Sequence, residues 1–171
     1  SIHSVERYLG DLAIEKGWTF EKPRFSTGRR VLVIGAGPSG LSAAYQLARM
    51  GHEVEIRDSS DVPGGMMRYG IPEFRLPRNV LDAEVARLLD LGVRIVNNYT
   101  VKDLMADQAE GGFEATFVAI GAHLSKRVDI PNRDASKIVD AVTFLRDVAS
   151  GERPLIGRKV AIYGGGNTAM D

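Results

Sequence analysis

The sequence predicts an α/β fold with a mostly parallel sheet. Short runs rich in β-branched residues recur along the chain, and they alternate with segments whose apolar residues repeat every three or four positions. Glycine or proline stands at many of the junctions. Strands that alternate with helices in this way form parallel sheets, because each helix returns the chain to the start of the next strand.

The first predicted element is a short amphipathic helix over residues 2–16. Its apolar residues are spaced three or four apart, with charged residues between them: Ile2, Val5, Leu9 and Leu12. This spacing indicates one apolar stripe that docks on another surface, and Gly17 ends the helix. Residues 18–30 are basic and irregular, so we expect a linker there that leads into the first strand.

The predicted sheet elements follow this linker in strict alternation. The strands are residues 31–34, 53–57, 93–96, 117–120 and 160–163, and the helices between them are residues 38–50, 77–91, 102–107 and 138–149. The first and fourth strands are uninterrupted apolar runs, which is typical of strands that are buried on both faces. Gly51 and Gly92 follow two of the helices, where a left-handed residue commonly ends the last turn.

Composition and charge exclude several classes of protein. The chain has 171 residues, 44% of them hydrophobic, with 22 basic and 22 acidic residues and no cysteine. The balanced charge gives no electrostatic reason to expect a nucleic acid or an anionic membrane as a partner. Without cysteine, these residues cannot supply disulfides or iron–sulfur ligands. We therefore expect a soluble, cytoplasmic chain of one domain and the start of another, with no metal site.

A glycine-rich loop follows the first strand. Its six residues form the pattern G-x-G-x-x-G: Gly35, Ala36, Gly37, Pro38, Ser39 and Gly40. The loop opens a helix, and Asp58 stands about 20 residues further on at the end of the second strand, which completes the Rossmann dinucleotide-binding pattern. In this pattern the glycines permit a tight turn and a close approach of the pyrophosphate to the helix N-terminus, and the acidic residue binds ribose hydroxyls.

The segment after the second strand favours a flavin over a nicotinamide in this first site. Residues 61–77 form a long excursion punctuated by glycine and proline, with apolar, aromatic and basic side chains. A chain that binds only NAD usually enters a helix sooner, whereas this excursion is suited to lie along a flat ring. We therefore expect FAD.

Residues 31–77, with Pro-Gly-Gly-Met-Met-Arg-Tyr-Gly-Ile-Pro-Glu-Phe-Arg-Leu-Pro at their centre, closely resemble the FAD-binding part of the glutamate synthase small subunit (beta chain) family. The same pyridine nucleotide-disulfide oxidoreductase-like module occurs in dihydropyrimidine dehydrogenase and in NADH-dependent ferredoxin:NADP oxidoreductases. Residues 1–18 resemble the tail of the N-terminal iron–sulfur helical domain of that family. The resemblance is specific for the module and does not choose among its members.

The resemblance implies roles for further residues. It places Gly64, Gly65 and Met66 beside the ribityl chain and ring of FAD, and Arg75 at the FAD phosphates or the ring edge. It implies a backbone contact from Val101 to adenine, and a turn at Gly121 that closes over the FAD, where this chain has Ile120 in place of a common threonine. Two alternatives stay open: Met66 and Met67 as core residues, and Arg75 as the partner in a surface ion pair.

A second glycine-rich loop follows the last predicted strand, with the pattern G-x-G-x-x-A from Gly164 to Ala169. The resemblance implies that it starts an NAD(P)H-binding domain, with four residues facing the pyrophosphate: Gly165, Gly166, Asn167 and Thr168. We therefore divide the chain into a helix and linker (1–28), an incomplete FAD-binding domain (29–157) and the start of an NAD(P)H-binding domain (158–171). The segment by itself is expected to bind FAD weakly or not at all, and to be inactive.

The sequence therefore predicts part of an NAD(P)H-dependent flavoprotein oxidoreductase, with FAD and either NADPH or NADH as cofactors. The cofactors carry the chemistry, and no residue stands out as a catalytic acid, base or nucleophile. By resemblance, electrons would pass to [4Fe–4S] clusters outside this segment, and the partners would be the rest of the chain and a large catalytic subunit or an iron–sulfur protein. Two alternatives remain, namely another two-dinucleotide reductase of the thioredoxin reductase kind and a non-catalytic scaffold.

Overall fold

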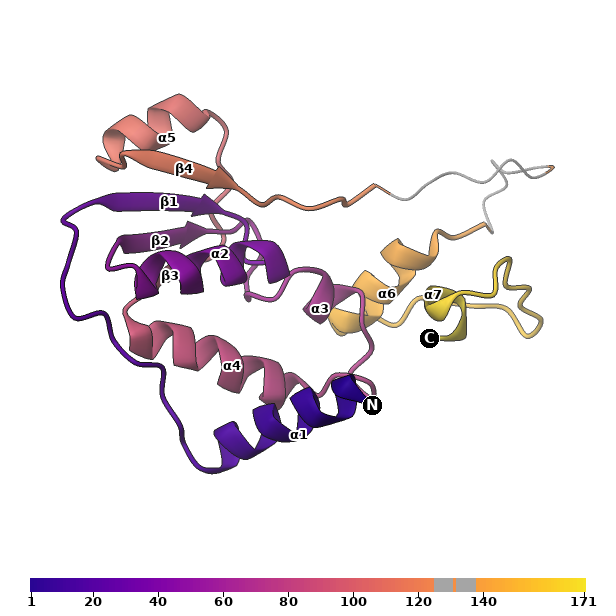
Figure 1. Ribbon diagram of the computed structural model, residues 1–171. Helices are drawn as coiled ribbons and strands as arrows, with labels where there is room; N and C mark the ends of the chain where they lie inside the picture. Colours follow the sequence, from indigo (N-terminus) through magenta and orange to yellow (C-terminus); the bar gives the residue numbers. More distant parts are fainter. Residues whose placement is uncertain (125–130, 132–137) are drawn as a thin grey trace.

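A four-stranded parallel sheet forms the centre of the molecule in the computed structural model, which describes residues 1–124, 131 and 138–171. The strand order is β3-β2-β1-β4, and Figure 1 shows the strands side by side. The strands are β1 (Arg30–Ile34), β2 (Glu53–Arg57), β3 (Arg94–Val96) and β4 (Ala115–Val118). All three pairings are parallel, with β1 between β2 and β4. The predicted α/β class is therefore confirmed.

Helices connect and cover these strands. They are α1 (Ile2–Glu15), α2 (Pro38–Arg49), α3 (Met66–Tyr69), α4 (Arg78–Leu91), α5 (Leu104–Glu110), α6 (Ala141–Ala149) and α7 (Asn167–Met170). Helix α1 packs along α4, and α6 and α7 lie together beside α3 (Figure 1). Within the described residues no helix combines the length and the apolar character that a membrane crossing requires. The one-turn helix α3 was not predicted, because four residues are too few to show a helical period.

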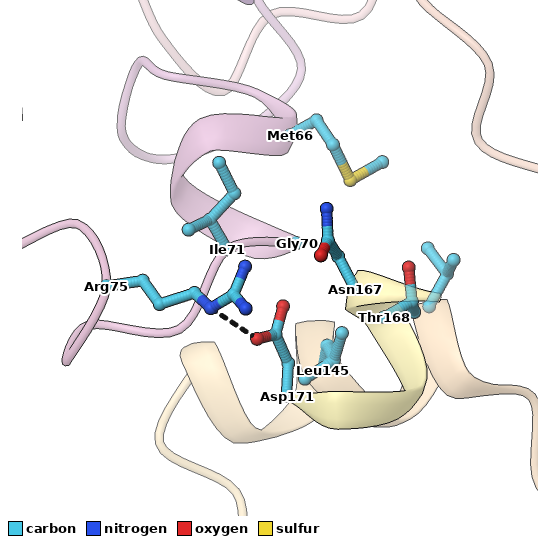
Figure 2. A pocket seen from close by; sticks show the side chains of 9 residues that line it. Met66, Gly70, Ile71, Arg75, Leu145, Asn167, Thr168 and Asp171 are labelled. Carbon is cyan, nitrogen blue, oxygen red and sulfur yellow. Dashed lines mark ion pairs between the residues drawn. The ribbon is translucent and has the colours of Figure 1, made fainter. Parts of the chain in front are cut away.

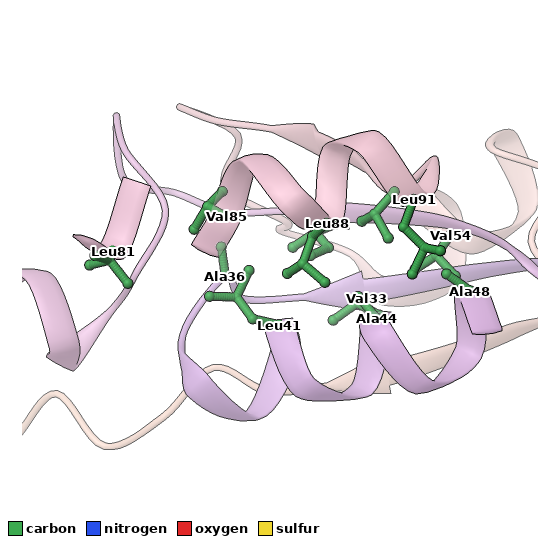
Figure 3. Packing of buried hydrophobic residues seen from close by; sticks show 12 residues of the cluster. Val33, Ala36, Leu41, Ala44, Ala48, Val54, Leu81, Val85, Leu88 and Leu91 are labelled. Carbon is green, nitrogen blue, oxygen red and sulfur yellow. The ribbon is translucent and has the colours of Figure 1, made fainter. Parts of the chain in front are cut away.

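The main core lies between one face of the sheet and helices α2 and α4 (Figure 3). Val33, Val54 and Ile56 point into it from the strands and are almost completely buried. The helices contribute residues at helical spacing: Leu41, Ala44, Ala48, Leu81, Val85, Leu88 and Leu91. Alternate residues of β1 face the other way, where Leu32 and Ile34 pack with Phe113. Strand β1 is therefore buried on both faces, as its uninterrupted apolar sequence predicted.

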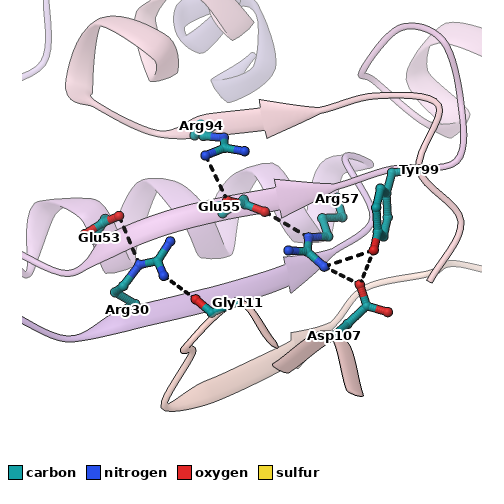
Figure 4. Close-up of polar contacts among 8 residues, drawn as sticks. All are labelled: Arg30, Glu53, Glu55, Arg57, Arg94, Tyr99, Asp107 and Gly111. Atoms are coloured by element: carbon teal, nitrogen blue, oxygen red, sulfur yellow. Dashed lines mark hydrogen bonds and ion pairs between the residues drawn. The ribbon is translucent and has the colours of Figure 1, made fainter. Parts of the chain in front are cut away.

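A charged cluster on the second face of the sheet fixes α5 and the segment before it (Figure 4). Arg57 Nε donates to Glu55 Oε1 at 2.8 Å, and Arg57 Nη1 pairs with Asp107. Tyr99 Oη donates to Asp107 at 2.7 Å, and the guanidinium lies over the Tyr99 ring. Burial alone would lower the pKa of Arg57, but the hydrogen bonds to the two carboxylates outweigh it and raise that pKa. Arg57 therefore stays charged and links β2 to α5.

The structure corrects two strand predictions. Residues 160–163 form no strand, and Val160, Ile162 and Tyr163 are exposed. A strand needs a neighbour for its backbone hydrogen bonds, and no strand among the described residues pairs with this segment. The fourth strand lies at residues 115–118 rather than 117–120 and is mostly exposed instead of buried. Within the described residues β4 is an edge strand with β1 on one side only.

Candidate functional site

The first glycine loop lies at the carboxyl end of β1. At two of its glycines, the packing of the chain's own backbone leaves no room for a side chain. Gly35 has φ of 107°, and a Cβ atom there would lie 2.3 Å from the carbonyl oxygen of Ala119. A Cβ atom on Gly40 would lie 1.8 Å from the carbonyl oxygen of Gly35. Backbone therefore crosses backbone at both positions, and no side chain fits.

Gly37 differs from these two glycines. Its φ and ψ are −79° and −177°, which any residue adopts, and the nearest atom to an added Cβ is the Cα of Gly65 at 3.9 Å. Nothing in the described structure requires glycine here. Gly37 caps helix α2, whose N-terminus has no side-chain cap in the described residues. Without a side chain at position 37 a phosphate has room to approach these amide groups closely, so the loop fits a dinucleotide pyrophosphate.

Asp58 closes the loop from the end of β2. Its Oδ2 accepts a hydrogen bond from the backbone amide of Ala36 at 2.5 Å, and its Oδ1 accepts one from that of Ser60 at 2.7 Å. A carboxylate has about four acceptor positions, so two remain for ribose hydroxyls. Asp58 therefore also shapes the loop, which was not expected from the sequence.

The predicted flavin-lining turn packs directly on this loop. The amide of Gly64 donates to the carbonyl of Ala36 at 2.8 Å, and a Cβ atom on Gly65 would lie 2.7 Å from the Cα of Gly37. Gly64 and Gly65 both have positive φ, at 131° and 52°. The structure thus brings residues 35–40 and 64–65 together at one end of the sheet.

The two methionines after this turn have different environments. Met67 packs against the main core, so the core interpretation holds for it. Met66 is 43% exposed and lines a cavity, so it is available to a ligand. Sequence reasoning missed Arg68, which is buried and donates to the carbonyl of Pro63 at 2.7 Å while pairing with Asp82. The signal in the sequence was that Arg68 is a charged residue within an otherwise apolar stretch, where it needs a partner if it is buried.

A tyrosine in α3 fixes the start of the turn through a carboxylate. Tyr69 Oη donates to Asp61 Oδ1 at 2.5 Å. This hydrogen bond lowers the pKa of Asp61, and burial together with the same bond raises the pKa of Tyr69. A carboxylate with a lowered pKa in the folded state stabilises the fold above its unfolded pKa, and this contribution is lost as the pH falls through the folded pKa.

Replacing Tyr69 by phenylalanine should raise the pKa of Asp61 towards the ordinary value of about 3.9, because the donated hydrogen bond is removed. The carboxyl titration of Asp61 by NMR measures this shift. Tyr8→Phe, at an exposed position in α1, is the control and should leave Asp61 unchanged. An unaltered Asp61 titration in Tyr69→Phe would contradict the interpretation.

A cavity of about 230 Å³ brings residues of the two predicted cofactor sites together (Figure 2). Its lining includes Met66 and Arg75 from the first site, and Asn167 and Thr168 from the second. Arg75 Nε lies 2.7 Å from Asp171 Oδ1. The structure therefore pairs Arg75 with a buried residue that sequence reasoning did not select.

The remaining predicted residues lie in three places. Val101 packs against the Leu32, Ile34 and Phe113 cluster, and Gly121 follows β4 with φ of 72°. Ala119, two residues earlier, donates its amide to Ile34 and touches Gly35, so the predicted closing turn starts at the first loop. Gly165 and Gly166 are exposed and have no atom within 4 Å of an added Cβ.

The two glycine loops have matching backbone conformations. Gly35 and Gly164 both have positive φ, at 107° and 144°. Gly37 and Gly166 are both extended, and each precedes a helix. Ala169 occupies the position that corresponds to Gly40, and its Cβ would lie 3.6 Å from one added to Gly164. The second loop therefore has the shape of the first, with room for the alanine.

A family model described as pyridine nucleotide-disulphide oxidoreductase matches residues 29–171. The chain belongs to this family. The family's members are NAD(P)H-dependent flavoprotein oxidoreductases, which is the class predicted from the first glycine loop, the segment at residues 61–77 and the resemblance. The match includes both loops and the turn between them.

Curated relatives confirm the resemblance to the glutamate synthase small subunit family. The chain is 36% identical to a putative glutamate synthase [NADPH] small chain of Cereibacter sphaeroides, over 100% of this chain and 44% of the relative. It is 37% identical to the NAD-dependent dihydropyrimidine dehydrogenase subunit PreT of Escherichia coli K12, over 99% and 41%. It is 43% identical to the NADP(+)-dependent formate dehydrogenase subunit beta of Moorella thermoacetica, over 88% and 22%. The chain thus spans less than half of each relative.

Solved structures share the fold. Mycobacterium tuberculosis FprA in complex with NADPH aligns with a TM-score of 0.60 at 21% identity, over 70% of this chain and 28% of that one. The 6-hydroxypseudooxynicotine amine oxidase of Pseudomonas geniculata aligns with a TM-score of 0.55 at 26% identity, over 83% and 22%. The strands and helices of this chain are therefore arranged as in parts of larger proteins of known structure.

Proposed function

We propose that this chain is the FAD-binding part of an NAD(P)H-dependent oxidoreductase that passes electrons from NAD(P)H, through FAD, to iron–sulfur clusters or a partner subunit. The protein would resemble the small subunit of glutamate synthase. The observation that carries the proposal is Gly37, a glycine without an internal structural reason at the N-terminus of α2. Space left at this point, next to Asp58 and the turn at Gly64, suits a pyrophosphate and its ribose.

The proposal assigns the residues to two cofactors. FAD would be held by residues 35–40, Asp58, Gly64 to Met66, Arg75, Val101 and Gly121, and the nicotinamide dinucleotide by residues 165–168. FAD, when bound, supplies the change from hydride transfer to single-electron transfer. The chain's own residues bind and orient the cofactors: α2 offers its amide groups to phosphate, and Asp58 accepts from hydroxyls while shaping the loop.

The proposed division of the chain is a helix and linker (1–28), an FAD-binding domain (29–157) and the start of an NAD(P)H-binding domain (158–171). Relatives named as subunits support a larger partner, either a catalytic subunit or an iron–sulfur protein. We place any [4Fe–4S] clusters outside this segment, which has no cysteine. A cytoplasmic location belongs to the same proposal.

The test is the flavin content of the purified protein that contains this chain. We expect one FAD per chain and a visible flavin absorption band that bleaches when NADPH or NADH is added without oxygen. Bleaching by one nucleotide at much lower concentration identifies the electron donor. A flavin that neither nucleotide reduces would favour the scaffold alternative, and a protein that binds no FAD would overturn the proposal.

A further inference from the structure

An ion pair joins two segments that lie far apart in the sequence. Arg75 follows α3, and Asp171 follows α7. Their side chains meet at the cavity that Met66, Asn167 and Thr168 also line, with Arg75 Nε 2.7 Å from Asp171 Oδ1 (Figure 2). The pair therefore connects the flavin-lining segment to the second glycine loop.

The two partners differ in burial. The Asp171 side chain is only 7% exposed, whereas that of Arg75 is 42% exposed. Asp171 Oδ1 has no aligned hydrogen bond in the described part of the chain, although Arg75 Nε lies within ion-pair distance. A buried carboxylate is costly without its counter-charge, so Asp171 depends on this arginine. The Arg75 side chain, in contrast, is partly exposed, and its contact with the buried carboxylate restricts the direction of its guanidinium.

The guanidinium of Arg75 has more donor groups than the one that faces Asp171. A guanidinium has five N–H groups in a rigid fork, and the contact with Asp171 is made at Nε. Figure 2 shows the guanidinium between Ile71 and the Asp171 carboxylate, with one terminal amino group directed away from that carboxylate. This amino group can therefore donate to a phosphate or carbonyl oxygen while Nε stays beside Asp171.

We propose that Asp171 is a positioning residue for Arg75: its carboxylate holds the guanidinium at Nε and so directs a terminal amino group towards bound FAD. This inference rests on the proposed FAD-binding function. It assigns a role in the binding of the first cofactor to the residue that follows the helix of the second loop. Asp171 acts only through Arg75, so replacing Asp171 should have no further effect once Arg75 has been replaced.

A double-mutant cycle on FAD affinity, measured by quenching of flavin fluorescence in the full protein, tests the proposal. Asp171→Asn should weaken FAD binding on the order of tenfold, because an oriented charge-assisted contact is lost. Arg75→Gln should weaken it at least as much. In the Arg75→Gln protein, adding Asp171→Asn should change the affinity by less than about twofold. A merely structural aspartate would lower the affinity again in that background.

Arg75→Lys gives a second measurement that leaves Asp171 in place. A lysine ammonium paired with Asp171 offers no fork, so the affinity for FAD should fall nearly as far as in Arg75→Gln. Asp11→Asn, which removes an exposed ion pair with Arg7 in α1, is the control and should leave the affinity unchanged.

The outcomes separate this inference from the proposed function. An unsubstituted protein that binds no FAD overturns both. If it binds FAD, the inference alone is overturned by any of three results: unchanged affinity in Asp171→Asn, losses that multiply in the double variant, or wild-type affinity in Arg75→Lys.

Discussion

Replacing Gly37 by alanine should leave the fold intact and weaken FAD binding at least about a hundredfold, or about 2.7 kcal/mol. The backbone of Gly37 is extended, and the nearest atom to a new methyl group lies at 3.9 Å, so the protein accommodates the change. A pyrophosphate bound at the α2 N-terminus would meet that methyl group and lose its close contacts with the amides. Fluorescence titration with FAD and thermal unfolding measure the two effects separately.

Gly166→Ala is the matched variant in the second loop, because Gly166 has the same extended conformation and open surroundings. It should leave FAD affinity unchanged and weaken binding of the nicotinamide dinucleotide. Equal FAD affinity in Gly37→Ala and the unsubstituted protein would remove the main support for the first site.

Replacing Gly40 by alanine should destabilise the fold by about 3 kcal/mol or more, in the presence or absence of FAD. The new Cβ would lie 1.8 Å from the Gly35 carbonyl oxygen and 3.2 Å from a methyl group of Val33. Helix α2 would have to move away from β1, and α2 carries part of the main core. Chemical denaturation followed by circular dichroism measures the loss.

Gly10→Ala is the control for this prediction. Gly10 lies inside α1 with no atom within 4 Å of an added Cβ, so alanine should stabilise the protein by about 0.5–1 kcal/mol. A Gly40→Ala protein as stable as the unsubstituted one would show that α2 does not pack on β1 as closely as described.

The sequence predicted the elements whose signal is local. The apolar run of β1, the stripe of α4 and the left-handed Gly51 each depend on neighbouring residues, and each lies where it was expected. The predicted strand at residues 160–163 has an equally apolar run but does not form. A strand depends on a partner, and a local pattern carries no information about whether that partner is present.

The candidate site shows the same limit. The glycine pattern located both loops, but it could not separate the glycines that the fold needs, Gly35 and Gly40, from Gly37, which the fold leaves open. The backbone bonds of Asp58 and the ion pair of Arg75 with Asp171 were also invisible, because the partners are distant in the sequence.

The sequence by itself determined the α/β alternation and the two glycine loops, since periodicity and turn geometry are properties of short segments. The resemblance of residues 31–77 to known proteins indicated the family. Only the tertiary structure decided which side chains meet. It packed the turn at Gly64 on the first loop and paired Arg75 with Asp171. Such contacts follow from how helices and strands pack in space, and packing joins residues that no local pattern connects.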